Sequence, residues 1–148
     1  MTEQQLLEQE NVYAFDRFTH ADAARFGEAI VSLAREHGEK PVGVRVVVGN
    51  TTVFQYLMDG KDSDAWLEKK QRTVLRSGHS SLWVRAVNDE THEFDGWREE
   101  GCAICGGGFP LTVGGMLAGC LCASGLAHEE DHQLILDAIT KMKEGKAK

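Results

Sequence analysis

The sequence predicts a mixed α+β fold, in which helices pack against a sheet built from β-hairpins. Two apolar runs between residues 42 and 58 flank Gly49-Asn50, a dipeptide typical of hairpin turns. Two further runs, "GGGFPLTVGG" and "MLAGCLCAS", predict a second hairpin within residues 106–124. Helical patterns occur before, between and after the hairpins, so the expected architecture is a sandwich of helices and sheet.

The N-terminal part predicts two helices separated by a strand. Thr2 and Gln5 have the spacing of a capping box and can begin a short first helix. Residues 11–18, "NVYAFDRF", alternate well enough between apolar and polar for a strand. Thr19 and Asp22 resemble a second capping box. The helix that they begin has apolar residues at helical spacing: Ala23, Phe26, Ile30, Leu33 and Ala34.

The rest of the chain predicts three more helices. Residues 62–77 are helical, and Ser80 can cap a further helix that ends near residue 88. Ser124-Gly125 ends the second hairpin, and a last helix is expected at about 127–143.

Length and charge narrow the classes of partner. The 148 residues contain no repeat or low-complexity linker, so a single domain over residues 1–148 is expected. With 16 Lys and Arg residues against 23 Asp and Glu residues, the net charge of −7 argues against nucleic acid or an anionic membrane as the partner. The sequence has no apolar leader and no run of membrane-spanning length, which predicts a cytoplasmic location without a membrane partner.

The expected helix 62–77 carries one lysine on its apolar side. At 100° per residue, Lys70 falls between Trp66 and Val74, so its ammonium should be poorly hydrated. The lysine either covers core surface with its stem or holds an anion. Its partner is then a ligand bound at Gly106–Gly108, where glycine lets backbone N–H groups approach closely, or a carboxylate such as Asp131.

Four cysteines are expected to be reduced thiols in the cytoplasm. Cys102-x-x-Cys105 together with Cys120-x-Cys122 could make a zinc site, but the second spacing is poor for zinc ligands. Cys120 and Cys122 also lie in an apolar strand, where cysteine packs as a small hydrophobic residue. Structural thiols are favoured, with zinc binding or redox chemistry as the alternative.

His128-Glu129-x-x-His132 matches the HExxH pattern of zinc proteases. In those enzymes the motif follows several turns of buried helix, whereas here Ser124-Gly125 stops the chain just upstream. Acidic residues at this place are also what a first helical turn favours, because they oppose the positive end of the helix dipole. We therefore expect an ordinary helix start and no structural zinc.

Three segments together resemble the GlcG/HbpS-like family, and more specifically its uncharacterised UPF branch, often labelled as containing a heme-degrading domain. The segments are "WLEKKQRTVLRSGHSSL" (66–82), "GGGFPL" (106–111) and "ASGLAHEEDHQLI" (123–135). The resemblance covers nearly the whole chain. The family's Lys-x-x-Thr segment is matched by Lys70 and Thr73, its glycine-rich loop by the triple glycine, and its closing turn by Ser124-Gly125 and then Asp131.

The resemblance implies a five-stranded antiparallel sheet between helices and assembly into homo-oligomers. It also implies that some relatives bind heme, while others are linked to corrinoid or glycolate metabolism. Burial of Trp66, Trp83 or Trp97 between subunits would agree with such an assembly, since aromatic residues favour interface cores.

Two functional hypotheses follow. The first is a homo-oligomeric binding protein for a small anionic ligand or cofactor, heme among them, with His132 as an iron ligand. Its binding residues would be Lys70, Arg72, Thr73, His79, Gly106, Gly107, Gly108 and Asp131. The alternative is an enzyme acting on a small carboxylate or metabolite, with Lys70 or His79 as acid/base. Binding is favoured, because a heme degrader needs a reductant and the sequence has no flavin or nicotinamide site.

Overall fold

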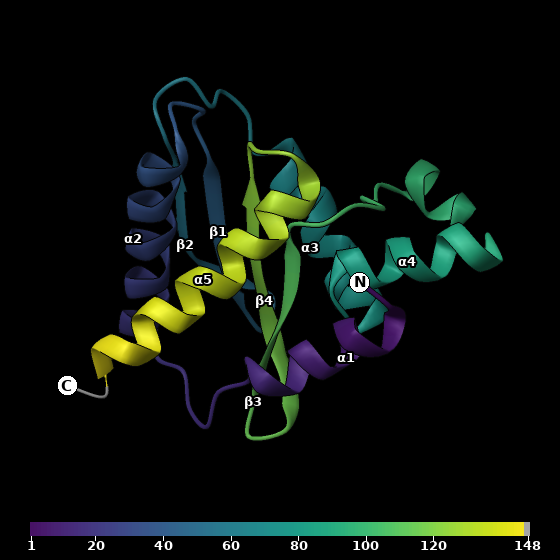
Figure 1. Ribbon diagram of the computed structural model, residues 1–148, viewed down its shortest axis with the longest axis horizontal. Helices are drawn as coiled ribbons and strands as arrows, with labels where there is room; N and C mark the ends of the chain where they lie inside the picture. The colour runs from purple at the N-terminus through teal and green to yellow at the C-terminus, as the bar shows by residue number, and fades with distance from the viewer. Residues whose placement is uncertain (147–148) are drawn as a thin grey trace.

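The computed structural model describes residues 1–146 and contains a four-stranded antiparallel sheet with the strand order β2-β1-β4-β3 (Figure 1). The strands are β1 (Gly43–Val48), β2 (Thr51–Leu57), β3 (Gly108–Val113) and β4 (Met116–Ser124). The helices are α1 (Glu3–Val12), α2 (His20–His37), α3 (Ala65–Ser77), α4 (Ser81–Thr91), the 3-10 helix η1 (Asp95–Glu100) and α5 (His128–Lys146). None of the helices in residues 1–146 combines the length and the apolar character needed to cross a membrane.

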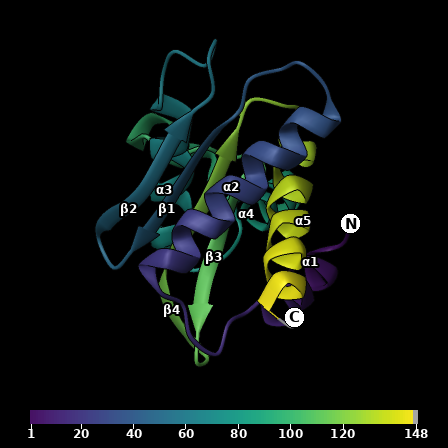
Figure 2. The same cartoon turned by 90° about the vertical axis from the view of Figure 1, so that its left-hand side faces the viewer.

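Helices cover both faces of the sheet, as predicted. α2 and α5 lie side by side on one face, and α3 lies on the other (Figure 2). Between the sheet and the first pair of helices is the larger core, to which Phe26, Ile30, Val44, Phe109, Leu121, Ile135 and Ile139 contribute. Val47, Cys120 and Cys122 face α3 and pack against its Leu67 and Val74. Cys120 and Cys122 are therefore core thiols.

The expected fifth strand is absent from the described residues, which corrects both the family-based strand number and the strand predicted at 11–18. α1 continues to Val12, and α2 has its N-cap at Thr19, so few residues remain between the helices. Only Phe15 pairs with the sheet, through an isolated parallel bridge to Val113. Alternation in the sequence described the burial of Phe15, but α1 takes up the first two residues of the predicted strand, and the rest forms only this single bridge.

Local signals placed most other elements correctly. Both capping boxes form, at Thr2 with Gln5 and at Thr19 with Asp22. Both hairpins form, and Gly49 has a φ of +64°, which glycine adopts without strain. The predicted helices differ from α3, α4 and α5 by a few residues at their ends. η1, which projects with α4 away from the sheet, was not predicted (Figure 1).

Candidate functional site

Lys70 and Asp131 form a buried ion pair between α3 and the start of α5. Their side chains are each 3% exposed, and Lys70 Nζ lies 3.1 Å from Asp131 Oδ2. Lys70 Nζ also donates a hydrogen bond to the Ala123 carbonyl at 2.9 Å. The predicted inward lysine is confirmed, and of its two expected partners the structure shows the carboxylate.

Asp131 also holds the turn before α5. Its Oδ1 accepts a hydrogen bond from the backbone N–H of Leu126 at 2.9 Å, and its Oδ2 accepts one from Gly125 at 3.4 Å. Burial raises the pKa of Asp131, while Lys70 and the two backbone donors act in the opposite direction. The carboxylate thus links the turn after β4 and α5 to α3, and it neutralises the charge of Lys70 within the protein.

The triple glycine packs closely behind this pair. Gly107 has a φ of +121°, and a Cβ at that position would lie 2.4 Å from Lys70 Nζ. Two of the three backbone donors already have protein acceptors: Gly106 N–H donates to His128 Nδ1 and Gly108 N–H to Ser81 Oγ, both at 2.9 Å. Glycine is required here for close packing against the lysine, and two of the donors expected for an anion are occupied.

A small cleft lies in front of the ion pair. It has a volume of about 280 Å³ and is lined by Lys61, Trp66, Lys70, Cys105, Ser124, Gly125, Leu126, His128 and Asp131. We call it the Lys61 cleft. Its walls come from the loop before α3, the first turn of α3, the segment before the triple glycine, and the turn that begins α5.

Lys61 is the cation of this cleft that remains available to an anionic ligand. It is half-buried and donates to Ser124 Oγ at 3.3 Å, and within residues 1–146 it forms no ion pair with a carboxylate. A serine hydroxyl stabilises an ammonium far less than a carboxylate does. An anion entering the cleft would therefore meet the uncompensated charge of Lys61 first.

His128 offers the cleft a hydrogen-bond donor. Burial lowers the pKa of its imidazole, which is therefore neutral at pH 7, and the positive charge of Arg85 lowers the pKa further. Because Nδ1 accepts from Gly106 N–H, the proton of the neutral ring is on Nε2. A histidine that ligates a metal through Nε2 usually donates its Nδ1–H to a protein group, so His128 has the opposite tautomer.

His132 is enclosed between α5 and α1. It is 2% exposed, its Nε2 lies 2.8 Å from Gln9 Oε1, and its ring packs on Phe109. Nδ1 is buried and has no hydrogen-bond partner among the described residues. Burial lowers the pKa of His132 to about 4. Within residues 1–146, no group of three or more His, Cys, Asp or Glu side chains is arranged to hold a metal ion.

The remaining predicted site residues lie outside the Lys61 cleft. Arg72 is 53% exposed and pairs with Glu68 at 3.6 Å. Thr73 is fully buried and donates to the Ala103 carbonyl at 2.7 Å. His79 Nδ1 lies 2.9 Å from a Glu10 carboxylate oxygen, so it faces α1. Sequence spacing placed these side chains on α3 or just after it but could not reveal their partners.

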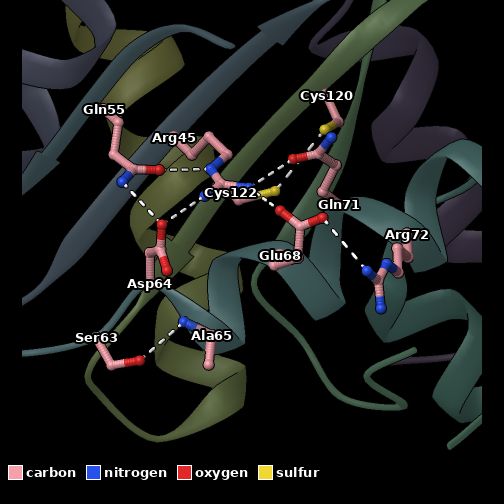
Figure 3. Close-up of polar contacts among 10 residues, drawn as sticks. All are labelled: Arg45, Gln55, Ser63, Asp64, Ala65, Glu68, Gln71, Arg72, Cys120 and Cys122. Carbon is pink, nitrogen blue, oxygen red and sulfur yellow. Dashed lines mark hydrogen bonds and ion pairs between the residues drawn. The ribbon is translucent and has the colours of Figure 1, made fainter. Parts of the chain in front are cut away.

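A buried arginine fixes the start of α3 (Figure 3). Arg45 on β1 is 6% exposed and donates to the side chains of Gln55 (2.6 Å), Gln71 (2.8 Å) and Asp64 (2.9 Å), and it also pairs with Glu68. Asp64 is the N-cap residue of α3, so this network anchors the end of the loop that carries Lys61. In the sequence, the feature that indicates this network is a single charged residue inside the apolar run "VGVRVVV".

The cysteines divide between core and cleft. All four are free thiols, and Cys120 Sγ lies 3.8 Å from Cys122 Sγ in the core. Cys105 is half-buried and lines the Lys61 cleft. Burial raises the pKa of the Cys105 thiol, which favours its protonated form over the thiolate that binds metals or acts as a nucleophile.

Comparisons with known proteins match this fold and nearly the whole chain. The family model described as "Haem degrading protein HbpS-like" matches residues 18–140. A UPF0303 protein of Streptomyces coelicolor is 36% identical over 144 residues, covering 93% of this chain and 90% of the relative. The chain belongs to the HbpS-like family. The resemblance found in the sequence motifs is thereby confirmed, including the UPF branch.

Solved structures support the fold of this HbpS-like chain. The crystal structure of the Ybr137w protein has a TM-score of 0.90 at 24% identity and covers 100% of this chain and 91% of that chain. The crystal structure titled "PduOC:Heme Complex" has a TM-score of 0.72 at 22% identity and covers 83% and 93%, respectively. At these identities the likeness supports the fold.

The described residues do not fit heme as a ligand of the Lys61 cleft. Both nitrogens of His132 are buried, one of them against Gln9, and His128 has its proton on the nitrogen that would have to face iron. Cys105 favours the thiol form. Heme iron needs an axial ligand such as an imidazole nitrogen or a thiolate, and His128 and Cys105, which line the cleft, do not present one.

Proposed function

We propose that this HbpS-like protein binds a small anionic ligand in the Lys61 cleft. The observation that carries the proposal is the unpaired ammonium of Lys61 in a lining whose other charges, Lys70 and Asp131, compensate each other. The imidazole of His128 supplies a neutral donor, and Trp66 supplies an aromatic wall. An anion here gains a charge-assisted hydrogen bond without displacing a protein carboxylate.

In this proposal Lys70, Asp131 and the triple glycine form the framework of the site. The ion pair holds the turn before α5 in place, and the glycines let the backbone pass behind it. Pre-organised walls of this kind reduce the cost of binding. The proposal is for binding alone, since Lys70 is paired with Asp131 and His79 lies outside the Lys61 cleft, where it faces Glu10 of α1.

Heme shares the negative charge of this ligand class, and the family description and the PduOC title name it for other proteins. In this chain the proposal favours smaller anions, because the histidines and Cys105 do not present a ligand to the cleft. Addition of hemin should therefore give no absorption spectrum typical of histidine-ligated or thiolate-ligated heme. A spectrum of that kind that is lost in His132→Ala would restore the heme assignment.

We also propose that the protein acts as a homo-oligomer in the cytoplasm. Trp83 and Trp97 pack with Phe94 within the subunit, but Trp66 is 48% exposed and Met116 74% exposed, and contact with a second subunit would cover such side chains. The free thiols agree with a reducing compartment. Light scattering at micromolar concentration tests the assembly, and a mass of one 16.3 kDa chain would contradict it.

Calorimetric titration with acetate, propionate and benzoate tests the binding proposal. We expect saturable binding in the millimolar range or tighter for at least one of these acids. Lys61→Met should weaken it at least tenfold, because the substitution keeps most of the stem and removes the charge.

Lys141→Met is the matched control for Lys61→Met. Lys141 is also bonded to a serine hydroxyl, Ser32 Oγ at 3.1 Å, but it lies toward the far end of α5. Its substitution should leave binding unchanged. If neither the wild-type protein nor Lys141→Met binds any of the acids, or if Lys61→Met binds them equally well, the proposal is wrong.

A further inference from the structure

His128 lies between two clefts. One is the Lys61 cleft, and the other is a cleft of about 420 Å³ between α1, α4 and α5, which also contains Arg85. We call the second one the Arg85 cleft. Because the same imidazole lines both, the two clefts lie next to each other at the first residue of α5.

Arg85 is a second cation without a strong partner. Its side chain is 41% exposed, and its ion pair within the described residues is with Asp89, at 3.9 Å from Nε to Oδ2. That distance is too long for a hydrogen bond. The guanidinium therefore keeps donors that can bind a carboxylate through two parallel hydrogen bonds.

We infer that the two clefts form one groove for a molecule with two anionic groups, and that its ligand class is the dicarboxylates. One carboxylate pairs with Lys61 and accepts the Nε2–H of His128, and the other pairs with Arg85. The inference rests on the proposed function and names its ligand class. Linking the two carboxylates makes the second contact intramolecular, so the affinity rises without a second loss of translational freedom.

Two protein carboxylates lie at the rim of the groove. Asp89 and Glu129 are 67% and 79% exposed, so water screens their charges more than it screens the half-buried ammonium of Lys61. Glu129 approaches His128 Nε2 only to 3.8 Å. Both therefore weaken dianion binding modestly, and Glu129→Gln should strengthen the binding of dicarboxylates more than that of monocarboxylates.

The test compares linear α,ω-dicarboxylates of three to ten carbons with monocarboxylates of the same length by calorimetry on the full chain. At the chain length that spans the groove, the dicarboxylate should bind at least tenfold tighter than its monocarboxylate. Arg85→Met should remove this gain and leave monocarboxylate binding within about twofold of wild type, since Lys61 holds the first carboxylate. Arg25→Met is the control, because Arg25 is 51% exposed on α2 and lies near the far end of α5.

The outcomes separate the inference from the proposed function. If monocarboxylates bind and Lys61→Met weakens them, but no dicarboxylate of any length gains affinity, the site stands and the inference is wrong. A dicarboxylate gain that survives Arg85→Met, or that Arg25→Met also removes, likewise overturns the inference. If no acid binds, or if Lys61→Met changes nothing, the proposed function itself fails.

Discussion

Two lysines line the same cleft, and they differ in what already neutralises them. Lys70 is 2% exposed and has a carboxylate partner, whereas Lys61 is half-buried and bonded to a hydroxyl. A buried charge must be compensated within the protein, because leaving it unpaired costs several kcal/mol. In the proposed site the fully buried lysine is therefore framework, and the lysine that can still reach water binds the ligand.

The largest effect is expected when this compensation is broken at Lys70. Lys70→Met leaves the buried carboxylate of Asp131 without a counter-charge, so the free energy of unfolding should fall by about 3–5 kcal/mol. Asp131→Asn should also destabilise, and the double mutant should lose less than the sum of the two. Chemical denaturation measures all three variants. Lys69→Met, at the neighbouring lysine over Trp66, serves as the control, and additive losses would contradict the pairing.

Protonation of His132 should lower the free energy of unfolding nearly as much as Lys70→Met does. Its folded pKa is about 4, below the ordinary 6.5, so between these values the unfolded chain binds more protons than the folded one. Stability should therefore be complete above pH 6.5 and fall by about 3 kcal/mol as the pH drops through about 4. Denaturation curves of His132→Gln should lack this part of the pH dependence. If the variant loses as much stability at low pH as the wild type, other groups cause that loss.

Arg45→Met tests whether removing a buried cation costs less stability when its carboxylate partners are exposed. Its partners Asp64 and Glu68 are 50% and 43% exposed, so both carboxylates stay solvated when the guanidinium is removed. Arg45→Met should lower the free energy of unfolding by about 2 kcal/mol, less than Lys70→Met. If Arg45→Met loses as much stability as Lys70→Met, exposure of the carboxylate partners does not distinguish the two cations.

The smallest effect is expected at His128. His128→Ala removes the acceptor for Gly106 N–H and should cost about 1 kcal/mol of stability. Elemental analysis should find no stoichiometric zinc in the purified protein or in this variant. One zinc per chain that is lost in His128→Ala would instead restore the HExxH interpretation.

The sequence predicted what depends on neighbours along the chain. Thr19 with Asp22 and the turn at Gly49 are local patterns, and helical spacing alone placed Lys70 on the buried face of α3. The strand at 11–18 was predicted wrongly, because alternation records burial but not whether the segment has room to pair.

Contacts between site residues that lie far apart in the sequence could not be predicted from local patterns. His79 meets Glu10 across 69 residues, and Lys61 meets Ser124 across 63. Such pairs depend on how α1 docks and on how the end of β4 lies beside the loop before α3, and nothing in the local composition specifies either. The sequence therefore placed Lys70 inward correctly but did not single out Lys61, the lysine that the proposed site uses.

A crystal structure grown with a brominated small carboxylate tests the central claim most directly, since the anomalous signal of bromine locates the acid. We predict the acid in the Lys61 cleft, with a carboxylate oxygen about 3 Å from Lys61 Nζ and the Lys70–Asp131 pair intact. An acid bound instead to Lys70 with Asp131 displaced, or at Arg72 or His79 with the Lys61 cleft empty, would contradict the account.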